Sequence, residues 1–336
     1  MLSAGRDRLP LDHPNARSLH SAPVPRSGGL AIMAGVVLGG AVAGVGYLPV
    51  LGLALVLVVI SHWDDSHGLS VRVRLGSHLL VAVVFLSVMA SDSFLPHSVS
   101  FGVSEVRASP SEPGLTSSIT SLGWLALGAL ATAWMTNLYN FMDGSDGLAG
   151  GMTLIGFAFY GIAAVLAGDP GLAALSFSVS AAALAFLFFN FHPARIFMGD
   201  SGSVPLGFLA AALGILGWRN GDWPLCFPLL VFSPFIVDAS VTLLKRILRR
   251  EKVWEAHRDH YYQRLVRAGL GHRNTALAEY ALMLLCGISG LLTLKLSGTI
   301  VVIELGVWFL IYTGLAFAAD RFWLRYRSAA VAANER

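Results

Sequence analysis

Long apolar stretches separated by short polar ones repeat along the whole chain of 336 residues. An α-helix needs about 20 apolar residues to cross a bilayer, and ten stretches reach or approach that length. Several are shorter, so tilting or local thinning of the membrane is expected. The pattern predicts an all-α bundle of about ten transmembrane helices, over residues 28–46, 47–62, 76–91, 119–137, 150–167, 172–190, 203–218, 224–244, 276–294 and 299–319.

Composition supports this interpretation and excludes other classes of protein. Hydrophobic residues make up 55% of the chain and charged residues only 13%, about half the charged fraction of a soluble domain. The mean hydropathy is +0.66. A soluble multidomain enzyme, a disordered chain and a fibrous protein are therefore excluded. Cys226 and Cys286 lie in apolar stretches, where we expect small packing side chains rather than a disulfide or a metal cluster.

The basic residues indicate how the chain is oriented. Cytosolic loops of membrane proteins are rich in lysine and arginine. If the spans alternate from a cytosolic amino terminus, 20 of the 23 lysines and arginines face the cytosol. We therefore expect both termini in the cytosol. The chain is predicted to form one integral-membrane domain over residues 1–336, with a cytosolic segment 1–27 and a basic cytosolic loop 245–275.

Acidic residues near the spans gather on the same, cytosolic side. Asp64 and Asp65 end the second span, Asp143 and Asp146 follow the fourth, and Asp200 follows the sixth. Any one acid at a membrane boundary is ordinary, because loops need polar residues. Five acids from three loops, in glycine-bracketed motifs, indicate a functional site.

The densest motif is 137–147, with the sequence NLYNFMDGSDG. Steps of three place Asn137, Asn140, Asp143 and Asp146 on one side of a helix end. Carboxylate and amide oxygens are hard ligands, which suit Mg²⁺ or Mn²⁺ and suit zinc poorly. The motif therefore predicts a divalent-cation site.

A second motif is 190–203, with the sequence NFHPARIFMGDSGS. Two glycines leave backbone amides exposed around Asp200, and a helix is expected just beyond, which favours a phosphate site. Ser201 and Ser203 are equally explained as helix N-caps. Phe197 could stack on a base or simply pack at the membrane interface, and the sequence leaves both readings open.

Carboxylates, a divalent metal and arginines together serve phosphoryl chemistry. At these motifs the sequence resembles the polyprenyl-phosphate N-acetylhexosamine-1-phosphate transferases, whose members start O-antigen, teichoic-acid and peptidoglycan lipid intermediates. Within that family it is most similar to the enzymes that initiate O-antigen. The resemblance rests on five blocks in the family's order: 12–20 (DHPNARSLH) with 25–29 (PRSGG), 63–65 (WDD), 137–147, 190–203 and 257–265 (HRDHYYQRL).

The resemblance implies transfer of an N-acetylaminosugar 1-phosphate from a UDP-sugar to undecaprenyl phosphate, with release of UMP and with Mg²⁺ or Mn²⁺ as cofactor. It places the protein in the bacterial inner membrane, with its active site on the cytosolic face. The expected partners are the two substrates and membrane lipid, with no nucleic acid, and a homodimer is left open. The acceptor phosphate is largely dianionic near pH 7, with a second pKa of about 6. Direct attack is therefore favoured over a covalent aspartyl intermediate.

Matching positions implies a role for each acid. Asp200 would be the principal Mg²⁺ ligand, with Asp143 close by and Asn140 holding the metal or the phosphates. Asp64 would orient or deprotonate the acceptor phosphate, with Asp65 beside it. The expected substrate contacts are Asp146, Asn190 and Phe197 for the uridine, and Arg17, Arg26 and Asn137 elsewhere in the pocket.

Two blocks depart from the family pattern. The family's Arg-Lys pair is Arg17-Ser18 here, which removes one cation from the phosphate region. The family's His-x-His-His reads His-Tyr-Tyr-Gln over 260–263, so only His260 is retained. We expect His260 to contact phosphate or sugar, with His257, Arg258 and Arg264 as further substrate contacts. Positive-inside topology and anionic lipid would also explain the basic residues of this loop.

The runner-up is a proton-coupled transporter, because acids also occur inside the predicted spans. Carriers place their polar residues near the membrane midplane in paired halves, whereas these motifs crowd one face. An intramembrane aspartyl protease would need two aspartates inside facing spans. The transferase is therefore the preferred interpretation.

Overall fold

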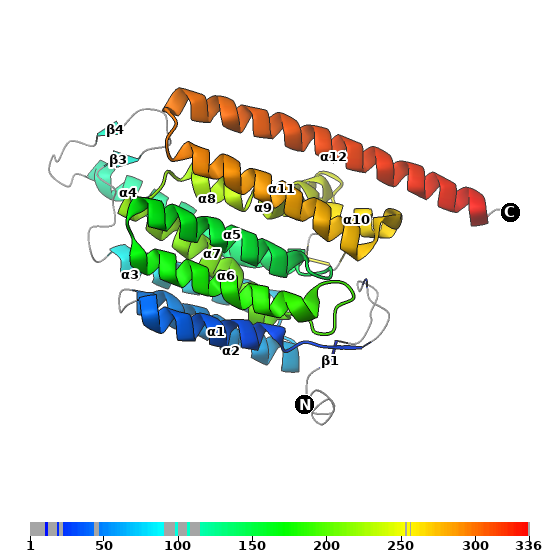
Figure 1. Ribbon diagram of the computed structural model, residues 1–336, viewed down its shortest axis with the longest axis horizontal. Helices are drawn as coiled ribbons and strands as arrows, with labels where there is room; N and C mark the ends of the chain where they lie inside the picture. The colour runs from blue at the N-terminus through cyan, green and yellow to red at the C-terminus, as the bar shows by residue number, and fades with distance from the viewer. Residues whose placement is uncertain are drawn as a thin grey trace.

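The computed structural model shows a bundle of long helices (Figure 1). It describes residues 11–12, 19, 23–43, 47–90, 98–99, 106–107, 115–252, 254–255 and 257–334. The helices are α1 (Gly28–Ala43), α2 (Leu48–His67), α3 (Val71–Ala90), α4 (Leu115–Met142), α5 (Leu148–Ala167), α6 (Pro170–Asn190), α7 (Asp200–Asn220), α8 (Cys226–Val231), α9 (Ser233–Leu248), α10 (Tyr261–Leu265), α11 (Gly271–Thr293) and α12 (Gly298–Asn334), with a π-helical turn at Val266–Leu270. Two short antiparallel strand pairs join β1 (Leu11–Asp12) to β2 (Val24–Pro25) and β3 (Ser98–Val99) to β4 (Val106–Arg107).

Seven helices within the described residues are long and apolar enough to cross a membrane. The protein is thus a mostly helical, multi-pass membrane protein, as the hydropathy pattern predicts. Each of the ten predicted spans overlaps a helix. The count of ten crossings and the cytosolic termini stay predictions.

The eighth predicted span, 224–244, is not one continuous helix. The chain forms the short helix α8 and then, after Phe232, the helix α9. Pro234 stands in the first turn of α9, where its missing N–H costs nothing. The amide of Phe232 bonds back to Pro228 O at 3.2 Å, which closes α8. A second helix therefore starts around Pro234, within a stretch that is mostly apolar in composition.

Helix α7 lies at the centre of the bundle. It packs against α2 and α4 and also contacts α1 and α5, while α6 joins α5 to α1 on the outside. Small residues allow this close packing: a Cβ added at Gly207 of α7 would lie 2.7 Å from Met135 O of α4. The core thus centres on the helix that begins with Asp200.

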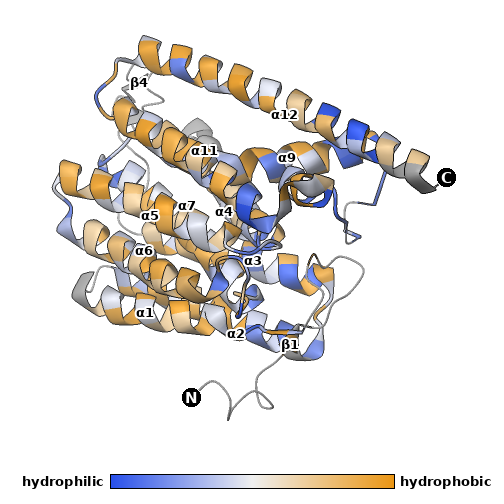
Figure 2. Cartoon of the chain, turned by 45° about the vertical axis from the view of Figure 1, so that its right-hand side comes forward, coloured by the Kyte–Doolittle hydropathy of each residue, from blue (hydrophilic) through white to orange (hydrophobic). Residues whose placement is uncertain are grey.

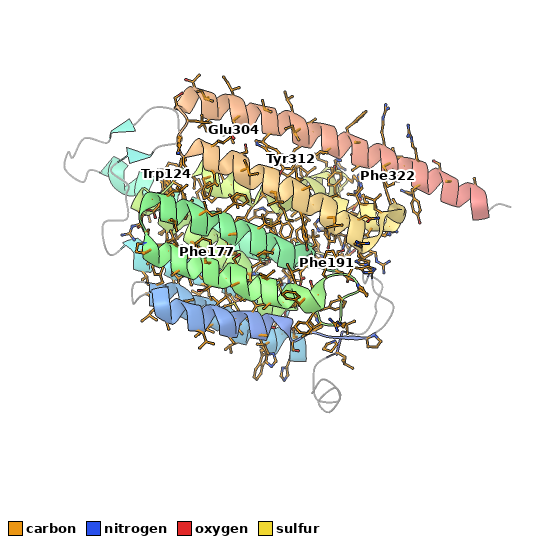
Figure 3. The ribbon with its side chains drawn as sticks, in the orientation of Figure 1. Trp124, Phe177, Phe191, Glu304, Tyr312 and Phe322 are labelled. Carbon is orange, nitrogen blue, oxygen red and sulfur yellow. The ribbon has the colours of Figure 1, made fainter. Side chains whose placement is uncertain are left out.

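Hydrophilic residues gather at one end of the bundle, around the ends of α2 and α9 and the outer half of α12 (Figure 2). The long helix α12 lies along the edge of the bundle and is held there by polar contacts. Glu304 and Tyr312 point toward α11 (Figure 3), where Glu304 Oε1 bonds to Ser289 and the Tyr312 hydroxyl lies 3.3 Å from Cys286 Sγ. At the hydrophilic end, Asp320 binds Lys245 Nζ at 2.6 Å. These contacts tie α12 to the helices that carry the basic loop.

Candidate active site

A cavity of about 1210 Å³ opens at the hydrophilic end of the bundle. Charged and amide side chains line it near the helix ends. Leu75 and Leu79 of α3, Leu130 and Trp134 of α4 and Leu243 of α9 line it further into the helices. The predicted site residues that line this cavity are Arg26, Asp64, Asn137, Asn140, Asp143, Asp146, Asn190, Phe197, Asp200, His257 and His260.

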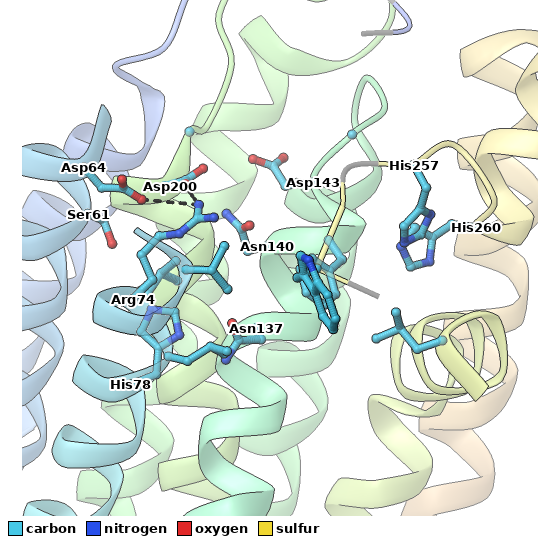
Figure 4. A pocket seen from close by; sticks show the side chains of 18 of the residues that line it. Ser61, Asp64, Arg74, His78, Asn137, Asn140, Asp143, Asp200, His257 and His260 are labelled. Carbon is cyan, nitrogen blue, oxygen red and sulfur yellow. Dashed lines mark hydrogen bonds and ion pairs between the residues drawn. The ribbon is translucent and has the colours of Figure 1, made fainter. Parts of the chain in front are cut away.

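Asp200, the first residue of α7, contacts two arginines, of which Arg74 is labelled beside it in Figure 4. Arg26 Nη2 is 3.4 Å from Asp200 Oδ1 and 3.4 Å from Asp65 Oδ1. Arg74 Nη1 is 3.4 Å from Asp64 Oδ2 and 3.9 Å from Asp200 Oδ2. The two guanidinium groups therefore link the carboxylates of α2 and α7, and both are placed to meet a phosphate that approaches these acids.

The end of α2 fixes Asp64. Gly68 has a φ of 70°, a left-handed conformation that glycine adopts readily, and it ends the helix with its amide bonded to Asp64 O at 2.8 Å. The chain then turns so that Leu69 N donates to Asp64 Oδ1 at 2.5 Å. Asp65 does not line the cavity: its side chain is 8% exposed and faces Arg26. Only one acid of the pair thus opens on the cavity.

Helix α4 continues to Met142, five residues beyond the predicted span, and carries two of the predicted amides. Asn137 Nδ2 donates to Ala133 O at 2.7 Å, and Asn140 Nδ2 donates to Ser203 Oγ at 3.0 Å. Both amide nitrogens are thus engaged inside the protein, and Asn137 has a further side-chain hydrogen bond with His78 of α3. Asp143 follows the last turn of α4, and Figure 4 shows its carboxyl group at the same end of the cavity as Asp200.

Asp146 is held by two other segments of the chain. Its Oδ2 accepts from His192 Nδ1 at 2.6 Å and from the backbone N–H of Ala194 at 3.1 Å. His272, at the start of α11, stacks on His192 with ring centroids 5.4 Å apart, and its Nδ1 accepts from Asp146 N at 3.3 Å. Asp146 is 8% exposed. It therefore joins three segments, and only part of it faces the cavity where a uridine contact was predicted.

The segment 196–199 crosses the start of α1 through backbone hydrogen bonds. Phe197 N donates to Pro25 O at 2.8 Å, and Gly28 N and Gly29 N donate to Phe197 O and Met198 O at 3.0 and 2.9 Å. Gly29 is needed here, because a Cβ would lie 2.3 Å from Gly202 N. The first and fourth sequence blocks thus form one frame, from which Phe197 faces the cavity.

Asn190 braces the same frame from the end of α6. Its Oδ1 accepts from Gly147 N at 2.9 Å and its Nδ2 donates to Ile196 O at 2.9 Å. Both polar atoms of the amide are therefore used inside the protein. Asn190 lines the cavity but is 4% exposed, so the geometry gives it a structural task beside the predicted substrate contact.

The basic loop closes the other side of the cavity with His257 and His260. Burial, together with the nearby His260 and Arg246, lowers the pKa of His257 to about 4, so this ring is neutral near pH 7. The structure does not bring Arg258 and Arg264 to the cavity lining. Arg264 instead binds Asp320 of α12 at 2.9 Å. Arg17 lies outside the described residues.

The cavity lining also includes residues that the sequence did not single out as site residues, among them Arg74, His78 and His272. Arg74 was counted only among the positive-inside cations. His78, one turn further along α3, is 6% exposed and interacts with Asn137. His272 lies in the last part of the basic loop. The i, i+4 spacing of Arg74 and His78 could have placed them on one face of α3, but nothing in the sequence indicates which face meets the acids.

The donor set of the cavity can be compared with what Mg²⁺ needs. No group of three or more His, Cys, Asp or Glu side chains in the described part of the chain is placed to hold a metal ion. Mg²⁺ typically binds through one or two carboxylates, several waters and substrate phosphates, so it does not require such a group. Asp143 and Asp200 offer two carboxylates and Asn140 an amide oxygen around one cavity. This hard-oxygen chemistry fits Mg²⁺ bound jointly with a phosphate substrate.

Comparison with known proteins agrees with the motifs. Residues 47–218 match the model of glycosyl transferase family 4. A probable undecaprenyl-phosphate N-acetylglucosaminyl 1-phosphate transferase of Bacillus subtilis (strain 168) is 32% identical over 290 residues, which cover 84% of this chain and 76% of that protein. The undecaprenyl-phosphate alpha-N-acetylglucosaminyl 1-phosphate transferase of Salmonella typhimurium (strain LT2) is 28% identical, over 83% of this chain and 75% of that protein.

A second group of relatives consists of phospho-N-acetylmuramoyl-pentapeptide-transferases. The phospho-N-acetylmuramoyl-pentapeptide-transferase of Synechococcus sp. (strain JA-3-3Ab) is 34% identical over 212 residues, 58% of this chain and 56% of that protein. Taken with the longer matches, this shows that the chain belongs to glycosyl transferase family 4 and confirms the resemblance to polyprenyl-phosphate N-acetylhexosamine-1-phosphate transferases.

Proposed function

We propose that the protein transfers an N-acetylaminosugar 1-phosphate from a UDP-sugar to undecaprenyl phosphate, giving undecaprenyl-diphospho-sugar and UMP. The observation that carries this proposal is the two-part lining of one cavity. Arg26, Arg74 and the acids they contact lie at the helix ends, while leucines and a tryptophan line the part further into the helices. A phosphate on a long isoprenoid chain needs both surroundings.

The same cavity supports a direct displacement. An oxygen of the acceptor phosphate attacks the phosphorus that carries the sugar, and a new P–O bond forms. The bond from that phosphorus to the bridging diphosphate oxygen breaks, and UMP leaves with the electron pair, so no net proton transfer is required. The main obstacle is repulsion between two anions, which Arg26 and Arg74 would reduce. Mg²⁺, when bound by Asp200 and Asp143 with help from Asn140, would neutralise further phosphate charge.

The remaining residues would orient the substrates. Asp64, which Leu69 N and Arg74 fix at the end of α2, would direct the acceptor phosphate. Phe197 would stack on the uracil from its backbone-bonded frame, with Asp146 at the edge of that pocket. His260 would contact the diphosphate or the sugar from the basic loop.

We further propose ten membrane crossings with both termini in the cytosol, which puts this cavity on the cytosolic face of the inner membrane. The distribution of lysine and arginine supports that topology. Initiation of O-antigen, or of a related cell-envelope polysaccharide, is the proposed pathway, and it rests on the Arg-Ser-Leu-His and basic-loop motifs. Membership of glycosyl transferase family 4 favours this reaction over the proton-coupled transporter.

The reaction can be tested with membranes that contain the protein, undecaprenyl phosphate, Mg²⁺ and a panel of UDP-N-acetylaminosugars. Lipid-linked sugar and UMP should appear in equal amounts with at least one donor. Asp200→Asn, Asp143→Asn and Asp64→Asn should each lower turnover by about 100-fold or more. Asp222→Asn is a matched control, because Asp222 follows the opposite end of α7. Absence of both products with every donor would refute the transferase.

A further inference from the structure

Asp238 is a buried acid of α9 that the proposed reaction does not use. Asp238 is 7% exposed. Oδ1 accepts from the backbone N–H of Tyr261 at 2.9 Å, and Oδ2 accepts from that of Tyr262 at 3.0 Å. Thr242 Oγ1 adds a contact at 3.2 Å. A buried carboxylate is costly unless it is hydrogen-bonded, and here most of its partners belong to the first turn of α10.

His260, the residue before α10, is a further partner. Its Nδ1 lies 3.2 Å from Asp238 Oδ1. An ionised carboxylate only accepts hydrogen bonds, so this pair forms a hydrogen bond when Nδ1 carries the proton, and Nε2 is then the nitrogen that faces away from Asp238. His260 is 3% exposed and lines the cavity, on the side away from Asp64 in Figure 4. Asp238 therefore decides which nitrogen of this ring is available to a ligand.

Tyr262 connects the first turn of α10 to the loop that holds Asp143. Its ring stacks on His260 with centroids 5.9 Å apart and an interplanar angle of 19°. Its hydroxyl donates to Phe141 O at 3.0 Å, two residues before Asp143. A shift in the first turn of α10 would therefore move both His260 and the loop that holds Asp143.

We propose that Asp238 is a positioning residue of the active site. Through Nδ1 it holds His260 in the tautomer that presents Nε2 to the cavity. Through the backbone of Tyr261 and Tyr262 it fixes the start of α10 against the loop of Asp143. What the cavity does with His260 rests on the proposed function, but the hydrogen bonds themselves do not.

The test compares Asp238→Asn with Asp320→Asn, the matched control. Asp320 also holds the basic loop, but it does so through Lys245 and Arg264 rather than through His260. The tautomer of His260 is measured by ¹⁵N NMR of histidine-labelled protein in lipid nanodiscs, with His260→Gln to assign the signal. We expect a proton on Nδ1 in the wild type and in Asp320→Asn, and its loss in Asp238→Asn.

Kinetics with the UDP-sugar provide a second readout. Partners that orient an active group typically contribute about 10- to 100-fold, so kcat of Asp238→Asn should fall by that factor. Its KM for the UDP-sugar should change by less than about threefold, because the residue does not touch substrate. A general loss of folded protein would lower the active fraction without changing the tautomer of the remainder.

Three results would overturn the proposal: a proton on Nε2 of His260 in the wild type, an unchanged tautomer in Asp238→Asn, or a kcat of Asp238→Asn equal to that of Asp320→Asn. If Asp238→Asn does not accumulate in membranes, the wild-type spectrum decides alone. A wild-type protein that makes no lipid-linked product would refute the proposed function, while the tautomer measurement would still stand.

Discussion

The contact between Gly144 and Tyr262 gives a sharp test of how the active-site loop is packed. A Cβ added at Gly144 would lie 2.2 Å from the Tyr262 hydroxyl oxygen but 3.3 Å from the ring carbon Cζ that bears it. The hydroxyl is engaged with Phe141 O, and Tyr262 is fully buried, so the ring has little room to withdraw. The loop of Asp143 must move instead.

The expected magnitudes follow from this geometry. Overpacking of a buried site typically costs about 1–3 kcal/mol, so Gly144→Ala should lower kcat/KM by about 10- to 100-fold as Asp143 shifts. Tyr262→Phe loses one hydrogen bond, about 1 kcal/mol, and should cost less than about tenfold. In the double variant the clashing oxygen is gone. It should therefore recover about tenfold over Gly144→Ala, about 1.4 kcal/mol, and with the cost of Tyr262→Phe included the coupling is about 2.4 kcal/mol.

The rate at which lipid-linked product forms and the melting temperature in detergent should be measured for the wild type, Gly144→Ala, Tyr262→Phe and the double variant. Gly76→Ala is the matched control, because an added Cβ there meets nothing within 4 Å. It should leave turnover unchanged and should not lower the melting temperature, because alanine is the better residue in a helix interior. If Gly144→Ala behaves like the wild type, or if the two single effects simply multiply in the double variant, the packing described for this loop is wrong.

Further predictions concern charge, metal and pH. Arg74→Gln should lower kcat/KM by about 10- to 100-fold, because hydrogen bonds to charged groups are worth about 1.5–3 kcal/mol, whereas Arg325→Gln on α12 should have no effect. Removal of divalent cations by a chelator should stop product formation, and Mg²⁺ or Mn²⁺ should restore it; full turnover in chelator would contradict the cation site. The pKa of His257 is lowered from 6.5 to about 4, so the unfolded chain binds the extra proton first and stability falls as pH drops through that window. The difference in melting temperature, His257→Gln minus wild type, should therefore be more positive at about pH 5 than at about pH 7; an equal difference at both would contradict the burial of His257.

Hydropathy was sufficient to locate the helices, because lipid-facing and core-facing residues are both apolar. It could not locate the break between α8 and α9, where the flanking residues are mostly apolar and Pro234, in the first turn of α9, signals the change. Helices α4 and α12 also continue beyond the ends of the predicted spans. Helices in this protein continue past the apolar stretch into polar sequence, as Asn137 to Met142 of α4 show.

Motif reasoning gathered acids from three loops, and the structure places Asp64, Asp143 and Asp200 around one cavity. Motif reasoning could not predict the roles that residues take through tertiary contacts. The carboxylate of Asp146 is engaged by His192 and a backbone amide from another loop. Arg264 turns to Asp320, 56 residues away. Such pairings depend on how helices cross, which spacing along one chain does not encode.

The backbone frame between the start of α1 and the segment 196–199 has a consequence for engineering. Its hydrogen bonds join main-chain atoms, so they are indifferent to the side chain at Phe197. A library that varies this position should therefore preserve folding while it tests the proposed contact between Phe197 and the uracil. The main chain holds this wall of the cavity together, so the side chain that lines it can be changed separately.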